Sequence, residues 1–234
     1  MTWLPLPAPA ARAARWVVKP CRAWRDRRAR RRRLAALPRR LNDSRDYEEY
    51  LMHQLARSLG MRTYIAHGRV QQLVDAFQRA DGRAAEGRSV LCVGCRNAHE
   101  LTAFREAGFD DVTGIDLFCE SRDVQVMDMH AMTFPDARFD VIFACHSLEH
   151  ALDADAVLAE FSRVARPGAV CVLEVPVRFK KWPGREDLQD FDSADGLIAR
   201  CAPILQEVLF VEEAGPVVRL VFRLRGRMTA AALR

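Results

Sequence analysis

The chain has 234 residues, 36 of them basic and 31 acidic, so its formal net charge is +5 and its isoelectric point lies near 9.0. Residues 1–40 hold 13 of the basic residues and one acidic residue, which leaves residues 41–234 with 23 basic and 30 acidic residues. Half of the residues are hydrophobic, which excludes a wholly disordered chain. The acidic body argues against a domain that binds nucleic acid with its whole surface.

Residues 1–40 form a basic tail rich in Ala, Arg and Pro, with six arginines within 27–33. Like charges at this density repel, so we expect a partly disordered tail, or a helix that forms only on an acidic partner. A solvated tail without a partner is the first expectation. An anionic membrane surface comes next, since clustered Arg with nearby Trp suits the interface, and RNA is a further alternative.

Apolar runs are short throughout the chain, far below the roughly 18 residues of a membrane span. The proline-broken start also lacks the pattern of a secretory signal. These features predict a cytoplasmic protein. If the basic tail binds an anionic membrane surface, the protein is expected at the inner face of the membrane. The Ala and Arg bias favours a bacterial source, although an Arg-rich leader also fits a mitochondrial transit peptide. Seven cysteines, an odd number, favour reduced thiols.

Residues 41–82 have the apolar spacing of helices. Ser44 can cap a first helix that ends near Gly60, and a second helix is predicted from Ile65 to Asp81. We therefore expect an N-terminal helical cap at 41–82, followed by a larger domain at 83–234.

From residue 88 short apolar runs alternate with amphipathic stretches. Strands are predicted at 89–93, 111–115, 123–127, 139–145 and 169–175, with helices at 97–107 and 154–166 between them, the latter stopped by Pro167-Gly168. A helix at 194–202 then precedes two strands, 207–213 and 217–224. Three residues join these last strands, too few for a crossover, so they are antiparallel. The predicted fold class is α/β: a Rossmann-like doubly wound sheet, mostly parallel, with a C-terminal antiparallel hairpin.

Two predicted strand ends carry residues suited to a nucleotide-like ligand. Gly94 follows the first strand, where a glycine lets a ligand approach the backbone. Asp116 ends the second strand 22 residues later, close to the spacing of acids that accept hydrogen bonds from ribose hydroxyls. Taken singly, Gly94 is also compatible with turn chemistry and Asp116 with a helix cap.

Further motifs follow at the later strand ends. In chain order they are Asp128-Met129-His130, Phe134-Pro135-Asp136, Arg138-Phe139-Asp140, His146-Ser147-Leu148-Glu149-His150 and Arg166-Pro167-Gly168. This ordered series resembles class I S-adenosylmethionine-dependent methyltransferases, in particular their broad small-molecule branch, over residues 88–224.

The resemblance implies S-adenosylmethionine as cofactor and assigns residues to it. Gly94, Cys95 and Arg96 are expected along the methionine part, and Asp116, followed by Leu117, at the ribose. The adenine is expected between Asp128 and Met129, with backbone near Cys145 completing the pocket floor.

The glycine loop departs from the family pattern, which reads acid-x-Gly-x-Gly-x-Gly. Here the corresponding residues are Cys92, Gly94, Arg96 and Ala98. Arg96 either pairs with the cofactor's carboxylate or crowds the loop. A non-catalytic cofactor-binding or interaction protein is therefore the alternative to an enzyme.

Two histidines are candidate proton acceptors for an acceptor hydroxyl, His146 and His150, with a structural role as the alternative. The sequence therefore predicts methyl transfer to oxygen on a small-molecule or glycan-linked acceptor. Residues expected near that acceptor are Glu174, Phe179, Trp182 and Arg185.

Two stretches of the sequence resemble metal-binding motifs, but neither has the context that a metal site needs. His146-x-x-Glu149-His150 spells an inverted zinc-protease motif, but it follows a strand directly rather than lying inside a helix. Cys92-x-x-Cys95 has no second cysteine pair. We therefore expect no metal, and a zinc hydrolase is the weakest of the functional alternatives.

Overall fold

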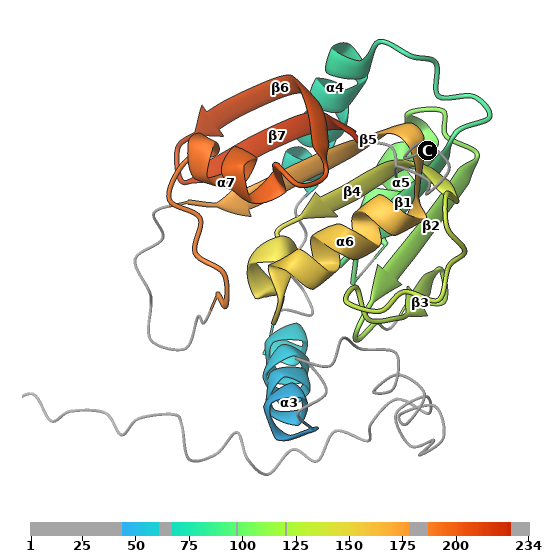
Figure 1. The fold of residues 1–234 in the computed structure, drawn as a ribbon. Helices are drawn as coiled ribbons and strands as arrows, with labels where there is room; N and C mark the ends of the chain where they lie inside the picture. The colour runs from blue at the N-terminus through green and yellow to red at the C-terminus, as the bar shows by residue number, and fades with distance from the viewer. Residues whose placement is uncertain (1–43, 61–66, 97, 120, 178–186, 226–234) are drawn as a thin grey trace, which may run out of the picture.

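The computed structural model describes residues 44–60, 67–96, 98–119, 121–177 and 187–225, and Figure 1 shows them as a central twisted sheet covered by helices. The basic tail at 1–40 lies outside the described residues, as do Phe179, Trp182 and Arg185. Within the described ranges, every helix is too short or too polar to span a bilayer.

The sheet has seven strands in the order β3-β2-β1-β4-β5-β7-β6. In chain order they are β1 (Ser89–Val93), β2 (Asp111–Asp116), β3 (Val124–Val126), β4 (Phe139–Cys145), β5 (Ala165–Pro176), β6 (Leu205–Ala214) and β7 (Val217–Leu224). Strands β1 to β5 pair in parallel, whereas β7 pairs antiparallel with both β5 and β6. The predicted fold class, including the closing hairpin, is confirmed.

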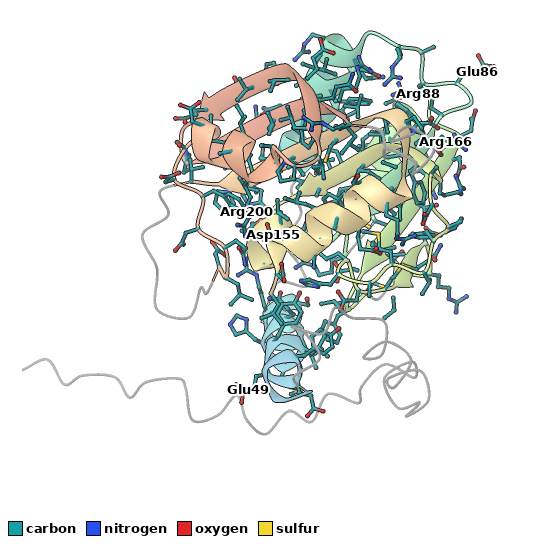
Figure 2. The ribbon with its side chains drawn as sticks, in the orientation of Figure 1. Glu49, Glu86, Arg88, Asp155, Arg166 and Arg200 are labelled. Atoms are coloured by element: carbon teal, nitrogen blue, oxygen red, sulfur yellow. The ribbon has the colours of Figure 1, made fainter. Side chains whose placement is uncertain are left out.

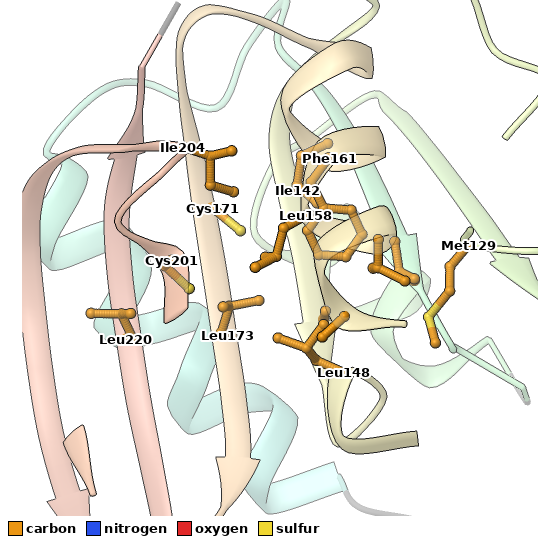
Figure 3. Close-up of a cluster of buried hydrophobic side chains, with 14 of the residues drawn as sticks. Met129, Ile142, Leu148, Leu158, Phe161, Cys171, Leu173, Cys201, Ile204 and Leu220 are labelled. Carbon is orange, nitrogen blue, oxygen red and sulfur yellow. The ribbon is translucent and has the colours of Figure 1, made fainter. Parts of the chain in front are cut away.

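Helices cover both faces of this sheet (Figure 1). They are α3 (Ser44–Gly60), α4 (His67–Asp81), α5 (His99–Glu106), α6 (Ala154–Val164) and α7 (Ala194–Cys201), with a short 3-10 helix, η4 (Leu148–His150), after β4. Apolar side chains of α4 and α5 pack in one cluster and those of α6 and α7 in another, on the opposite face. Figure 3 shows the second cluster, in which Leu158 and Phe161 of α6 lie beside Ile142 of β4.

Alternation along the central strands explains the continuous apolar runs in the sequence. In β1, Leu91 and Val93 belong to the cluster under α6, whereas Val90 and Cys92 belong to the cluster under α4 and α5. Successive strand residues point to opposite faces, and here both faces are covered, so every residue of β1 is buried.

The prediction that Pro167-Gly168 stops a helix at residue 166 is wrong in detail. Helix α6 already ends at Val164, and β5 begins at Ala165. The register between β4 and β5 shifts between Phe139 and Val141, which makes the Pro-Gly pair part of an irregular strand start, with Gly168 at φ +74°. A bulge tolerates both residues because it interrupts the regular hydrogen-bond ladder.

The predicted helical cap divides into two differently packed helices. Val70, Leu73 and Phe77 of α4 are buried against the sheet, so α4 is part of the main core. Helix α3 stands beside the end of α6 (Figure 1) and forms a separate small cluster through Tyr47, Tyr50 and Leu51.

The Phe134-Pro135-Asp136 motif is held in place by α6. Arg163 donates hydrogen bonds to the backbone oxygens of Met132 and Phe134 and to the Asp136 carboxylate, at 2.7–2.8 Å. The motif therefore supports the chain after β3 rather than contributing to the chemistry. At the other end of the helix, Asp155 lies 3.3 Å from Arg200 of α7, and Figure 2 shows the two side chains together.

Candidate functional site

A cavity of about 350 Å³ opens at the carboxyl ends of β1, β2 and β4. Parallel strands bring their C-terminal ends to the same sheet edge, where open α/β sheets bind ligands. Gly94 and Asp116, predicted from their strand ends, line this cavity together with Cys145, which the resemblance placed at its floor. The structure thus brings together residues that are 22 to 51 positions apart in the chain.

The loop after β1 keeps a glycine-like backbone although two of its expected glycines are absent. Gly94 has φ +77°, and a Cβ atom there would lie only 2.5 Å from the Cβ of Ser147. Ala98, at the position of the third family glycine, has φ +65° and so keeps the left-handed conformation. A non-glycine residue in this region is uncommon and costs conformational energy, which indicates that the surroundings hold the loop in this shape.

The Asp116 carboxylate is held by the backbone of two neighbouring segments. Its Oδ2 accepts a hydrogen bond from the amide of Arg96 at 3.0 Å, and its Oδ1 accepts one from the amide of Phe118 at 2.9 Å. Burial raises the pKa of Asp116 to about 6 against the lowering effect of these hydrogen bonds. A carboxylate oxygen can accept a further hydrogen bond, so an ionised Asp116 fits the two hydroxyls of a ribose.

Met129 and Asp128 are adjacent in sequence, but only Met129 lines the cavity. Met129 lines the cavity, together with Met127 and Leu117. The Asp128 side chain is instead engaged beneath α3: it accepts hydrogen bonds from the hydroxyl of Tyr47 and from the backbone amide of His130, and it lies 2.7 Å from the His130 ring. Burial favours a higher pKa for Asp128, but these partners outweigh it and the pKa is lowered.

Helix α3 supplies one wall of the cavity, which the sequence did not predict. Tyr50 and Gln54 line it, and the Tyr50 ring packs edge-on against His130 with centroids 5.6 Å apart. The only sequence signal was the pair of tyrosines, Tyr47 and Tyr50, at helical spacing, which is also the pattern of an ordinary core face.

His146 follows β4 in a left-handed conformation, with φ +54°. Its Nε2 lies 3.0 Å from Oε1 of Glu174, and its Nδ1 lies 3.4 Å from Oε1 of Glu149. Burial favours a lower pKa, but the two carboxylates dominate and raise the pKa of His146 to about 9. His146 is therefore protonated at neutral pH and poorly suited to the predicted role of a base.

Glu174 is fully buried and does not line the cavity, although it was predicted to bind substrate. Its Oε2 accepts a hydrogen bond from Arg219 of β7 at 2.7 Å, and its Oε1 lies 3.3 Å from Nε of Arg69 in α4. Burial favours a higher pKa for Glu174, but His146 and Arg219 lower it. The carboxylate positions three cationic side chains from behind the cavity wall.

His150, the second predicted base, lines the cavity beside two acids. Its Nδ1 lies 3.2 Å from Asp187, and its Nε2 lies 3.5 Å from Glu149. Asp187 is the first described residue after the stretch that contains Phe179, Trp182 and Arg185. The sequence did not single it out, since an isolated acid in a polar connection is normally solvated.

Cysteines of this region are packing residues. Cys92 and Cys95 are buried, and burial raises the pKa of both thiols. The Cys95 sulfur faces the backbone oxygen of Ile115 at 3.7 Å and fits against Gly114, where a Cβ would lie 2.6 Å away. Among the described residues, no group of three or more His, Cys, Asp or Glu side chains is arranged to hold a metal ion.

The sequence does not mark one acid of the cavity wall as part of a site. Glu100, in the first turn of α5, lines the cavity near Arg96 and Gly94. In sequence it resembles the many acids that favour the first turn of a helix for its dipole, so nothing marked it as part of a site.

A family model described as a methyltransferase domain matches residues 64–200, more than half of the chain. The chain belongs to this methyltransferase family. The family match confirms the predicted enzyme class, a class I methyltransferase, and the methyl donor that this class implies, S-adenosylmethionine. The non-catalytic protein and the zinc hydrolase are correspondingly disfavoured. A comparison with curated proteins found no sequence relative.

Solved structures support the fold of this methyltransferase. The 1,6-didemethyltoxoflavin-N1-methyltransferase of Burkholderia thailandensis, solved with 1,6-didemethyltoxoflavin and S-adenosylhomocysteine bound, is 16% identical with a TM-score of 0.63, covering 77% of this chain and 90% of its own. A Pyrococcus horikoshii protein is 15% identical with a TM-score of 0.55, covering 70% and 98%. The [4+2]-cyclase SpnF is 16% identical with a TM-score of 0.54, covering 67% and 81%. At such identities the likeness concerns the fold alone, and the chemistry must be argued from the site.

Proposed function

We propose that this methyltransferase transfers the methyl group of S-adenosylmethionine to a hydroxyl oxygen of a small-molecule or glycan-linked acceptor. The observation that supports this most directly is that one cavity joins the strand-end residues Gly94 and Asp116 to the histidine His150. A donor and an acceptor placed in such a shared cavity can be aligned for in-line transfer, which is the main requirement of the reaction.

The residues present fit the methyl donor. Asp116 would hold the ribose hydroxyls, Met129 would pack on the adenine, and the loop of Gly94, Cys95 and Arg96 would border the methionine part, with Cys145 at the floor. S-adenosylmethionine supplies a methyl group already activated by its positively charged sulfur, so the protein has mainly to orient the two reactants.

His150 is the residue we propose as base. Asp187 beside Nδ1 favours the tautomer with the proton on that atom, so Nε2, which lies 3.5 Å from Glu149, would be the atom that takes the proton of the acceptor hydroxyl. His146, which is protonated at neutral pH, would instead donate a hydrogen bond or stabilise negative charge on the acceptor oxygen.

Replacing His150 by Gln tests this assignment. General-base catalysis contributes about 10² to 10⁴ in rate, so His150→Gln is expected to lower kcat by about 100-fold while leaving the affinity for S-adenosylhomocysteine unchanged. The assay is formation of S-adenosylhomocysteine from S-adenosylmethionine with a panel of hydroxylated metabolites and glycans, and with a matched panel of amine acceptors. Turnover unaffected by His150→Gln, or turnover confined to nitrogen acceptors, would rule out the proposed base.

A further inference from the structure

Glu100 carries a buried carboxylate oxygen that the described protein residues do not satisfy. The residue lines the cavity, and its Oε2 is inaccessible to solvent without a hydrogen-bond partner among the described residues. A buried polar atom without a partner costs free energy, more so when the group is charged, and such atoms are rare in native proteins. An unsatisfied acceptor in a cavity wall points to a ligand that donates to it.

The electrostatic surroundings of Glu100 indicate that this donor is a cation. Burial raises the pKa of Glu100 to about 7, and the neighbouring carboxylate of Asp116 raises it further, whereas Arg96 lowers it. Two acids therefore share one end of the cavity, and the charge of Arg96 acts on both. A cationic group placed there would relieve the repulsion and favour the ionised form of both carboxyls.

Glu100 lies close to the loop after β1, in which the residues expected from the family pattern are changed. The acid that the resemblance leads one to expect on β1 is replaced by Cys92, which is fully buried in the apolar cluster. The charge of Glu100 nevertheless acts on the thiols of Cys92, Cys95 and Cys145 and raises their pKa values. Its carboxylate thus lies near the ends of β1 and β4, although it is attached to α5.

We propose that Glu100 is a cofactor-positioning residue whose Oε2 accepts a hydrogen bond from the α-ammonium group of the methionine part of S-adenosylmethionine. In this arrangement α5 supplies the negative charge that β1 lacks. The proposal rests on the placement of the methionine part along the Gly94 loop, given above as part of the proposed function.

The test compares two ligands that differ only in the amino-acid part. S-adenosylhomocysteine carries the ammonium group, and 5′-methylthioadenosine keeps the adenine and ribose but lacks it. Isothermal titration calorimetry is carried out on the full chain, on Glu100→Gln and on the control Glu106→Gln, which neutralises an exposed acid of the same helix. The amide of Gln has nearly the shape of the carboxylate and removes a buried charge, so Glu100→Gln is expected to fold.

Glu100→Gln is expected to weaken the binding of S-adenosylhomocysteine by about tenfold or more, because a charge-assisted hydrogen bond is lost. The same substitution should leave the affinity for methylthioadenosine within about twofold of that of the unaltered chain. Glu106→Gln should change the affinity for neither ligand. Unchanged S-adenosylhomocysteine affinity in Glu100→Gln, or equal weakening of both ligands, would overturn the assignment to the ammonium group. Absence of binding by the unaltered chain would instead refute the proposed function itself.

A pH series adds an independent readout. Since an ammonium ion favours the ionised carboxylate, the ratio of S-adenosylhomocysteine to methylthioadenosine affinity should rise as the pH passes through about 7, and this rise should be absent in Glu100→Gln. Charged and titratable groups that act on Glu100 or border it are Arg96, Asp116, His99, Cys92, Cys95 and Cys145. Because methylthioadenosine lacks the carboxylate of the amino-acid part as well as its ammonium group, the ratio by itself also reflects contacts of these groups with the carboxylate. The contribution of Glu100 is the part of the pH dependence that Glu100→Gln removes. A ratio that is flat in the unaltered chain would contradict the proposal.

Discussion

Glu174→Gln is expected to destabilise the protein by about 3–5 kcal/mol, the range for removing one partner of a buried ion pair. The Glu174 carboxylate is fully buried and lies within 3.3 Å of Arg69, His146 and Arg219. Its removal leaves these three cationic side chains facing a neutral amide. Urea unfolding of the two proteins, followed by circular dichroism, measures the difference in the free energy of unfolding.

The matched control is Glu207→Gln. Glu207 contacts another arginine of β7, Arg223, at 3.4 Å, but its side chain is 60% exposed. Solvent screens such a pair, so Glu207→Gln should lower the free energy of unfolding by less than about 1 kcal/mol. Similar losses in the two variants would show that the Glu174 cluster does not organise the site.

The Glu174 effect should depend on pH in a defined direction. The folded-state pKa of His146 is raised from its ordinary 6.5 to about 9, so the stability from its carboxylate partners is complete below pH 6.5 and is lost as the pH rises through 9. The difference between the unaltered protein and Glu174→Gln should therefore shrink from pH 6.5 to 9.

Gly94→Ala is the second substitution with a large expected effect. At φ +77° an alanine is strained, and its Cβ would lie 2.5 Å from the Cβ of Ser147, so the loop after β1 or the turn after β4 must move. Left-handed strain of about 1–2 kcal/mol and overpacking of about 1–3 kcal/mol lead us to expect a loss of stability of about 2–5 kcal/mol. Because this loop borders the proposed cofactor site, S-adenosylhomocysteine binding should fall as well, as measured by calorimetry.

Gly87→Ala separates the two causes. Gly87 has a similar φ of +71°, but a Cβ there would meet nothing within 4 Å. This control variant should lose only the conformational part of the stability, about 1–2 kcal/mol, and its affinity for S-adenosylhomocysteine should not change. Equal losses of stability in both variants, with binding retained in Gly94→Ala, would show that the contact with Ser147 does not shape the site.

The fold was predictable because the strands and helices carry local signals. Strands buried on both faces read as apolar runs, and the link between β6 and β7, only Gly215 and Pro216, forces an antiparallel hairpin. Gly94 and Asp116 were predictable for the same reason, since the ends of parallel strands must meet at one edge.

Roles that depend on distant partners were not predictable. Asp128 is engaged by Tyr47, 81 residues earlier in the chain, and the pKa of His146 depends on Glu174, 28 residues later. Glu100 has a helix-start position that by itself indicates only a favourable dipole interaction. In each case the chemical role arises from which segments pack together, and no spacing in the sequence expresses that packing.

The central claim is that the cavity at the ends of β1, β2 and β4 binds the methyl donor through Asp116. Calorimetric titration of S-adenosylhomocysteine into the unaltered chain and into Asp116→Ala tests it most directly. We predict saturable binding that Asp116→Ala weakens by about tenfold or more, since hydrogen bonds to a charged group are lost. Absence of binding at millimolar ligand, or an affinity unchanged by Asp116→Ala, would contradict this account.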